Sequence, residues 1–296
     1  MTHFYFVAAT IFLAAVVSAY GTQMRTAEIV DPLSHAKAYS YTIPDGWLFE
    51  GAIVAGSSCA ATPSPVFRLT SPDQITEMRM LPRFDWTWWD QPKPPSRQED
   101  DCLALDKEIT ATDFLKAMAG ILGVTIVRED PLPNHAELQA KMRLQTTGPR
   151  MDNARYVVRY TVNGTPVEED LTVKTLCMSS TGYTPYGSYP FHTCTAWVSR
   201  ARTHEGQLMD LRNMFAGIER SLVMDQQWNK SWASVMGRRS EQAGPGTAAR
   251  EKLVKDARGV RQRQYADFLA AREGKAASPH SGDWTDFVLG GLKVRK

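Results

Sequence analysis

The dipeptide Asn163-Gly164 constrains the fold more than any other feature, because alternating apolar and polar residues flank it on both sides. A two-residue type I′ turn requires positive φ at both central positions, which Asn-Gly adopts readily. The turn therefore predicts a hairpin of defined register, whose second strand runs to about Cys177. The expected pairs are Val162 with Thr165, Tyr160 with Val167, Arg159 with Glu168, Val158 with Glu169, and Tyr156 with Leu171.

Residues 77–88 show the clearest alternation in the chain. A period of two is typical of a half-buried strand. The residues of one parity predict a single apolar inner face; they are Met78, Met80, Phe84, Trp86 and Trp88. The residues of the other parity are expected on the outer face; they are Glu77, Arg79, Arg83, Asp85 and Thr87. Pro82 within this strand predicts an edge position or a bulge.

The remaining patterns predict an α+β fold, in which helices flank an antiparallel β-sheet. Further strands are expected over 47–54, 66–69, 124–127 and 192–201, and a loop over 179–190. Helices are expected over 113–122, 135–144 and 206–223, the first capped by Thr110 or Thr112 and ended by Gly123. This order of elements places one α+β domain over residues 25–222.

The N-terminus predicts export. Residues 4–19 form an uncharged apolar run that ends in Val17-Ser18-Ala19, a sequence suited to cleavage by signal peptidase. The run is shorter than the roughly 20 residues that span a bilayer. We expect residues 1–19 to be a signal peptide and the protein to be secreted or periplasmic. The alternative is an uncleaved anchor at residues 4–21, with the domain facing the periplasm.

The cysteines agree with this compartment. There are four, namely Cys59, Cys102, Cys177 and Cys194. None forms a Cys-x-x-Cys pair, which disfavours zinc binding and thioredoxin-like chemistry. An even number in an exported chain predicts two disulfides. We expect the pairs Cys59–Cys102 and Cys177–Cys194, because each pair then stays within its own half of the chain; the alternative is four buried thiols.

Charge is distributed unevenly along the chain. Between Asp225 and Lys296, 14 Lys and Arg face 8 Asp and Glu, so this segment carries +6 while the whole chain carries +2. We expect 225–296 to be a basic helical extension that contacts an envelope protein, an acidic polymer or anionic lipid. The alternative is a solvated helix. Nucleic acid is not an expected partner, because the net charge is small and the chain is exported.

No catalytic motif stands out. The chain has no nucleophile elbow, no phosphate-binding or dinucleotide-binding glycine loop and no His-Glu-x-x-His motif, and we expect neither a metal nor a cofactor. Carboxylates do gather near a tryptophan cluster, at Asp85, Asp90, Glu99, Asp100 and Asp101. Paired carboxylates beside tryptophan are typical of glycan sites. Trp89, Asp90 and Asp101 are therefore candidate ligand contacts, against the alternative that they only pack in the core and a loop.

One family resemblance involves four segments, namely Ile43-Pro44-Asp45-Gly46-Trp47, the strand around Arg68, Ser71-Pro72-Asp73, and the strand from Met78 to Phe84. Together they resemble the PsbP/Mog1-like group of α+β proteins over about residues 40–222. The resemblance implies an antiparallel sheet with flanking helices. The group mostly comprises accessory and binding proteins without shared catalytic residues, so it transfers no site.

These observations favour a non-enzymatic exported protein of the bacterial envelope that acts as an accessory or binds a ligand or partner. The alternative is a glycan-acting hydrolase of the envelope that uses the carboxylates near Trp89. The two classes predict different sites. A hydrolase needs convergent carboxylates in an open cleft, whereas a binding protein needs only a complementary surface.

Overall fold

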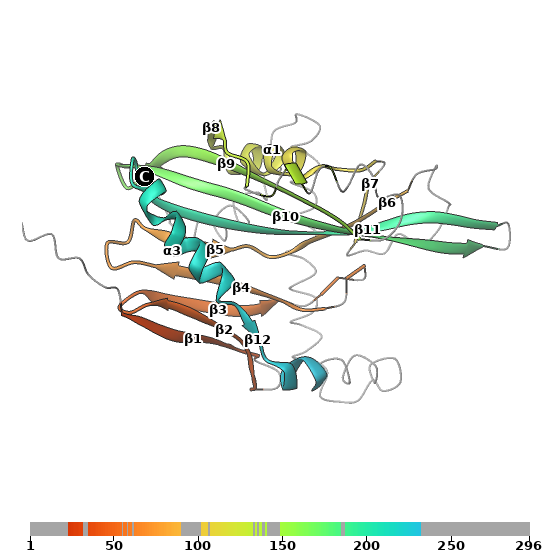
Figure 1. Ribbon diagram of the computed structural model, residues 1–296, viewed down its shortest axis with the longest axis horizontal. Coiled ribbons are helices and arrows are strands. Elements are labelled where there is room, and N and C mark those ends of the chain that lie inside the picture. Colours follow the sequence, from red (N-terminus) through yellow and green to blue (C-terminus); the bar gives the residue numbers. More distant parts are fainter. Residues whose placement is uncertain are drawn as a thin grey trace, which may run out of the picture.

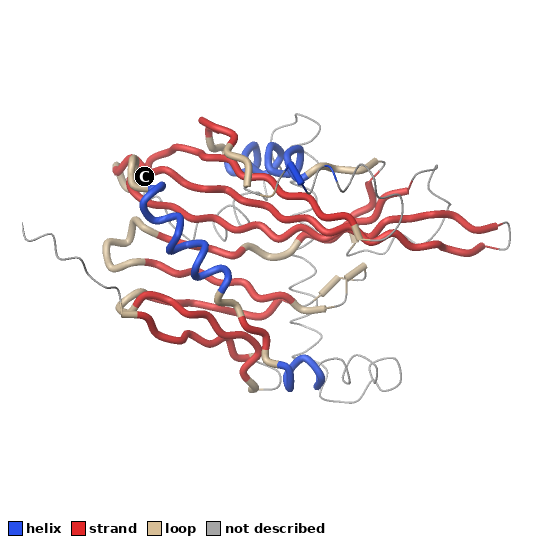
Figure 2. The backbone as a smooth tube through the Cα atoms, viewed as in Figure 1, coloured by secondary structure: helices blue, strands red, loops and turns tan. Residues whose placement is uncertain are grey.

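The chain folds mainly into antiparallel β-sheet with a few helices, and is therefore richer in strand than the α+β expectation (Figures 1 and 2). The computed structural model describes residues 23–31, 35–54, 56–57, 59–60, 62–89, 102–105, 107–132, 134, 136–137, 140, 149–184 and 187–231. The residues outside these ranges include the expected signal peptide, Asp90 to Asp101 and most of the expected basic extension.

The described strands and helices, in chain order, are β1 (Met24–Val30), β2 (Lys37–Pro44), β3 (Leu48–Val54), β4 (Ser64–Thr70), β5 (Glu77–Met80), β6 (Phe84–Trp89), β7 (Leu103–Leu105), α1 (Ala111–Leu122), β8 (Thr125–Glu129), β9 (Arg150–Val162), β10 (Thr165–Thr184), β11 (Gly187–His204), α3 (Leu208–Arg220) and β12 (Val223–Met224). Of the helix expected over 135–144, three residues are described, and all three are helical: Ala136, Glu137 and Ala140.

Two sheets form the framework. A nine-stranded sheet has the order β3-β4-β5-β11-β10-β9-β8, with β6 paired to β11 and β7 paired in parallel to β6. A three-stranded sheet has the order β1-β2-β12. Helix α1 packs on one face of the large sheet, while α3 and the small sheet pack on the other (Figure 1). We call these the α1 face and the α3 face.

The central hairpin has the predicted register. All five expected pairs are present, and both turn residues have positive φ, 50° at Asn163 and 82° at Gly164. The loop expected over 179–190 is wrong for its described residues, because β10 and β11 continue pairing as far as Thr184 and Gly187. Past Cys177, β10 pairs with β11 alone among the described strands, and the two extend as a long arm (Figure 1).

Residues 77–89 contain the bulge that Pro82 predicted. Both β5 and β6 pair with β11, Met80 opposite Ser199 and Phe84 opposite Ala196. The chain therefore has one more residue between these pairs than β11 has. An extra residue reverses the parity of side chains beyond it. The single inner face expected from the alternation is consequently wrong.

The two halves of this segment bury their apolar side chains on opposite faces of the sheet. Met78 packs in the core of the α3 face, whereas Phe84, Trp86 and Trp88 pack under α1. The charged residues expected on the outer face are also buried, since Glu77 and Arg79 are 4% exposed and Arg83 is 7% exposed. A charged side chain is buried at this level only when it is paired, and each of these three is.

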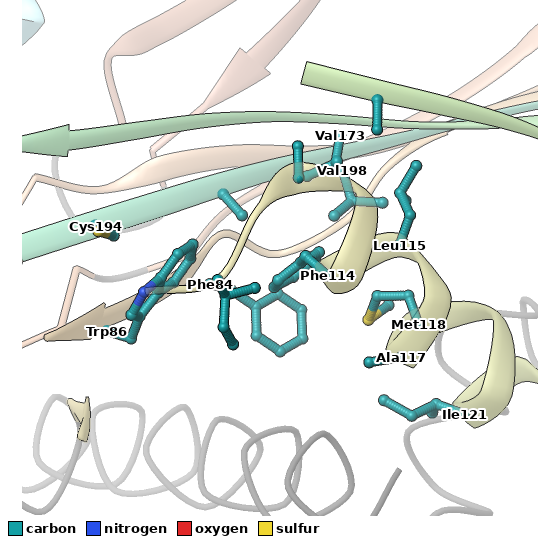
Figure 3. Close-up of a cluster of buried hydrophobic side chains, with 14 of the residues drawn as sticks. Phe84, Trp86, Phe114, Leu115, Ala117, Met118, Ile121, Val173, Cys194 and Val198 are labelled. Atoms are coloured by element: carbon teal, nitrogen blue, oxygen red, sulfur yellow. The ribbon is translucent and has the colours of Figure 1, made fainter. Parts of the chain in front are cut away.

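Helix α1 forms as its sequence predicts. The Thr110 side chain accepts a hydrogen bond from the Asp113 N–H, and Gly123 ends the helix with φ 63°. The apolar residues of α1 are buried, and Phe114 lies with its ring centroid 5.2 Å from that of Phe84 and 5.9 Å from that of Trp86. Figure 3 shows these rings beside Val173 and Val198 of the central strands. The first core thus joins α1 to the middle of the sheet.

The second core lies between the α3 face and the small sheet. It includes Ile29 and Tyr41 of β1 and β2, two strands that the sequence analysis did not identify. Helix α3 adds Leu208, Phe215 and Ile218, but it ends at Arg220, so the predicted extension to 223 is wrong. A bidentate ion pair also joins α3 to β10: the guanidinium of Arg212 donates two hydrogen bonds of 2.7 Å to Asp170.

The described start of the basic extension belongs to this second core. Val223 and Met224 form β12, which pairs with β2. Trp228 is 2% exposed, and its indole N–H donates a 2.8 Å hydrogen bond to the carboxylate of Asp31. Residues 223–231 therefore pack on the domain, which extends beyond the expected boundary at 222.

Both predicted disulfides are present, Cys59–Cys102 and Cys177–Cys194. Cys177 and Cys194 lie directly opposite each other on β10 and β11, at the base of the arm. Two disulfides are typical of proteins from an oxidising, extracellular or periplasmic environment. In the described part of the chain, no helix is both long and apolar enough to cross a membrane.

Candidate binding site on the α1 face

A row of arginines crosses the α1 face beyond the helix. Directly paired residues on neighbouring strands share a face, and the pairs here run from Glu50 on β3 to Arg68 on β4, Arg79 on β5 and Arg200 on β11. Three guanidinium groups therefore occupy adjacent strands. We call Arg68, Arg79 and Arg200 the arginine row.

The next row of the sheet supplies the carboxylates. Glu77 on β5 pairs with Arg202 on β11, which in turn pairs with Glu169 on β10. Glu77 and Glu169 are 4% and 1% exposed. Opposite charges on adjacent rows allow the arginines to be buried, because an unpaired buried charge costs several kcal/mol.

Glu77 is shared by three guanidinium groups. It accepts hydrogen bonds from both Nε and Nη2 of Arg79, the latter 2.8 Å long, and one of 2.9 Å from Arg68 Nε. The third group belongs to Arg202, whose Nη2 lies 3.5 Å from the same carboxylate. Burial alone would raise the pKa of Glu77, but the hydrogen bonds and charges of these arginines hold it below its ordinary value.

Glu169 forms the second centre of this cluster. It accepts hydrogen bonds from Arg200, including one of 2.8 Å from Nη2, and another from the hydroxyl of Tyr160. Burial and the charge of Glu169 both raise the pKa of Tyr160, so this phenol stays protonated and acts as a donor. Nη1 of Arg200 is buried and has no hydrogen-bond partner among the described residues.

A pocket of about 260 Å³ opens beside the arginine row. Its lining comes from β3, β4 and β5 and from the bulge that follows β5; the residues are Glu50, Gly51, Val66, Phe67, Arg68, Arg79, Met80 and Leu81. Leu81 belongs to the core under α1, Phe67 and Met80 pack with the second core, and Arg68 and Arg79 belong to the charged cluster. The pocket thus combines apolar side chains from both cores with the guanidinium groups of Arg68 and Arg79.

The site residues predicted from the sequence lie elsewhere or are not described. Trp89 is part-buried at the end of β6, opposite Phe191, and does not line the pocket. Asp90 and Asp101 lie outside the described residues, as do Glu99 and Asp100. The structure therefore brings none of the predicted ligand contacts to the pocket.

Asp85, the carboxylate next to Trp86, has a structural environment. It is fully buried and accepts hydrogen bonds of 2.7 Å from Ser57 and 2.9 Å from Thr195, with Arg83 Nε 2.8 Å away. A general acid or base must reach the proton it transfers in a bound substrate. Asp85 is enclosed by its own partners, so this carboxylate is suited to holding β6 and not to glycan hydrolysis.

Other reactive groups in the described residues do not form a recognisable centre. No three or more His, Cys, Asp and Glu side chains there lie close enough together to hold a metal ion. Ser179 and His192 are hydrogen-bonded at 3.0 Å across β10 and β11, with the imidazole stacked on Trp88 at 3.9 Å between ring centroids. This pair lies on the central strands and not in the pocket on β3–β5.

Sequence reasoning missed the arginine row because it treated residues 77–88 as one strand. Alternation assigned Arg79 to a solvent face, and nothing along the chain linked it to Arg200, 121 residues later. One available signal was the charge of the strand interiors: Arg68, Glu77, Arg79, Glu169, Arg200 and Arg202 all fall within strands that also carry core residues. Such strands bury charge only if neighbouring strands neutralise it.

Comparison with known proteins adds little to this geometry. No family model matches the chain, and no curated protein matches it. The solution structure of cyanobacterial PsbP (CyanoP) from Synechocystis sp. PCC 6803 is a weak structural match, with 11% sequence identity and a TM-score of 0.22, over 72% of this chain and 99% of that one. A similarity at this level carries no argument about function, so the site rests on its own residues.

Proposed function

We propose that this is an exported binding protein of the cell envelope, which holds a small ligand in the pocket beside Arg68 and Arg79. The observation that carries the proposal is the pocket itself: a hollow beside the arginine row whose lining is mainly apolar but includes two arginines. Small-molecule sites commonly combine apolar walls with a few placed polar groups. The pocket's charged lining residues, Glu50, Arg68 and Arg79, do not form a nucleophile–base pair, so binding without catalysis is the function it suits.

Export is the second part of the proposal. It is supported by the apolar N-terminal run and by two disulfides, which persist in oxidising compartments. We expect a mature chain that begins near Tyr20 with all four cysteines bonded. Intact-mass measurement and non-reducing peptide mapping of the secreted protein check this. A chain that retains Met1 and has free thiols would contradict it.

Fragment screening by NMR tests the pocket. With methyl groups labelled in the mature chain, we expect binding fragments to shift the signals of Val66, Met80 and Leu81. The exposed methyl groups of Val127 on β8, at the opposite edge of the sheet, serve as the internal control and should not move. The proposal is wrong if no fragment shifts the three pocket residues, or if fragments shift Val127 equally.

A further inference from the structure

One edge of the arm is open to a further strand. Up to Cys177, β10 lies between β9 and β11, but from Met178 to Thr184 it pairs with β11 alone among the described strands (Figure 1). Pro149, directly before β9, has no N–H group with which to continue the ladder. Along the arm, β10 therefore presents backbone N–H and C=O groups with which another strand can pair.

The other edge of the arm, along β11, is largely blocked. Strand β6 pairs with β11 as far as Trp89 and Phe191. The next residue of β11 toward the tip is Pro190, which has no N–H group to donate to an added strand. Strand addition to the arm is therefore favoured at β10.

The open edge lacks the features that usually prevent strand addition. Edge strands are commonly protected by charged side chains, proline or a β-bulge. Met178 to Thr184 contains no charged residue and no proline, and its pairing with β11 has no shift of register. The sequence contains no Asp, Glu, Lys or Arg between Lys174 and Arg200. Met178, which is 46% exposed, adds apolar surface at the start of this edge.

A second copy of the same chain offers a strand that fits. Two identical strands pair antiparallel about a twofold axis, and a charged residue near that axis then faces a like charge, which is destabilising. The arm has no such charge. We propose that two copies associate by antiparallel pairing of their β10 strands over Met178 to Thr184. This pairing does not depend on the pocket.

The pairing also explains how the arm is stabilised and why the assembly is finite. A two-stranded hairpin is marginally stable by itself, whereas three or more strands stabilise one another. Joining two arms gives a four-stranded sheet of the order β11-β10-β10-β11. Because the pairing is twofold and the β11 edges on the outside are largely blocked, the assembly ends at two copies.

Sedimentation velocity of the chain from Tyr20 onward, over a range of concentrations, tests the association. We expect the weight-average mass to rise toward twofold that of the monomer and no further. Because the interface contains no charged side chain, its dissociation constant should be nearly the same at low and high salt. A chain that stays monomeric at every concentration overturns the proposal. A dimer that dissociates as salt is raised would place the interface on a charged surface and also overturn it.

Matched variants test the twofold pairing. Thr181 is exposed and lies in the middle of the open edge, so pairing over the whole edge places it opposite itself. Thr181→Lys should raise the dissociation constant about fivefold. Ser188→Lys is the control, because Ser188 is exposed on the same face of the arm but belongs to β11, and it should leave association unchanged. A mixture of Thr181→Lys and Thr181→Glu should associate more tightly than either variant alone. Equal weakening by the control, or a mixture that is no tighter, contradicts the proposed pairing.

Hydrogen exchange locates the interface in the unmodified chain, so this test does not depend on a variant that folds. Alternate N–H groups of an antiparallel strand point to opposite neighbours. We expect the outward-pointing amides between Met178 and Thr184 to exchange rapidly at low concentration and to become protected as the dimer forms. The amides of β8, at the far edge of the large sheet, should not change. A dimer that leaves the β10 amides unprotected overturns the proposal.

Discussion

Trp228 provides a direct test of where the folded domain ends. Its indole is 2% exposed, lies 5.3 Å from the ring of Tyr39 and donates a 2.8 Å hydrogen bond to Asp31, which is itself 5% exposed. Trp228→Ala removes the ring from a core, which costs about 3–5 kcal/mol. Trp228→Phe keeps most of the apolar surface but removes the donor to a buried carboxylate, at a cost of about 1–3 kcal/mol.

Urea unfolding followed by circular dichroism measures both changes in the chain from Tyr20 onward. Trp197→Phe is the matched control, because Trp197 is only part-buried on β11 and the substitution removes the same atoms. We expect this control to change the free energy of unfolding by less than about 0.5 kcal/mol, as for most surface substitutions.

Truncation extends the same test. A chain cut after Leu222 loses β12 and Trp228 and should be at least as destabilised as Trp228→Ala, whereas a chain cut after Ser231 should keep its stability. A typical domain has only about 5–15 kcal/mol in total, so the difference is easily measured. If the shorter chain is as stable as the longer one, or if Trp228→Phe behaves like Trp197→Phe, the reasoning that residues 223–231 belong to the core is refuted.

Three further measurements probe the framework. Burial raises the pKa of Asp73, but the opposing effect of hydrogen bonds from Ser71 and from the Ile75 and Thr76 N–H groups is larger, so the pKa falls from 3.8 to about 2. The ionised Asp73 carboxylate therefore stabilises the folded state above about pH 4, and this stabilisation is lost as the pH falls toward 2. Because this carboxylate is 43% exposed, solvent screening limits the loss to about 1 kcal/mol. Urea unfolding at pH 6 and at pH 2.5 measures this loss in the free energy of unfolding, and Asp73→Asn should remove the contribution of Asp73 to it. Replacing both Cys177 and Cys194 by Ala opens a 17-residue loop and should cost about 3 kcal/mol; an unchanged urea midpoint would contradict this. Gly164→Ala, at φ 82°, should destabilise the fold by about 1–2 kcal/mol. Gly120→Ala, on the exposed side of α1, should instead stabilise it by about 0.5–1 kcal/mol. If thermal unfolding shows the Gly164→Ala variant to be the more stable of the two, the assignment of the turn is refuted.

Local signals predicted the parts of the fold that local geometry determines. The Asn163-Gly164 turn sets its own register through positive φ, and Thr110 and Gly123 mark the ends of α1, so these elements could be read from a few residues each. The disulfide Cys177–Cys194 was predicted from proximity along the chain, because both residues fall in the same half of it, and the structure places them opposite each other on β10 and β11.

Features that depend on tertiary contacts were not visible in the same way. Strands β1 and β2 bury Ile29 and Tyr41 only because α3 and Trp228, far along the chain, complete their core. The arm of β10 and β11 contains Gly, Tyr, Pro and Ser residues that resemble a loop, yet cross-strand pairing continues through them. Propensity is a weak guide where partners from distant segments supply the stabilisation.

The bulge at residues 81–83 links the fold to the candidate site. Without the extra residue, a strand that placed Trp86 under α1 would place Met78 and Met80 on that face too, and Arg79 would point toward the small sheet. With it, Arg79 shares the α1 face with the apolar core, while Met78 fills the core on the other side. Leu81, whose N–H donates a 2.9 Å hydrogen bond to Val198, then lies beside the arginine row and lines the pocket. A single inserted position in one strand therefore brings the apolar side chain of Leu81 and the guanidinium group of Arg79 to the lining of the same pocket.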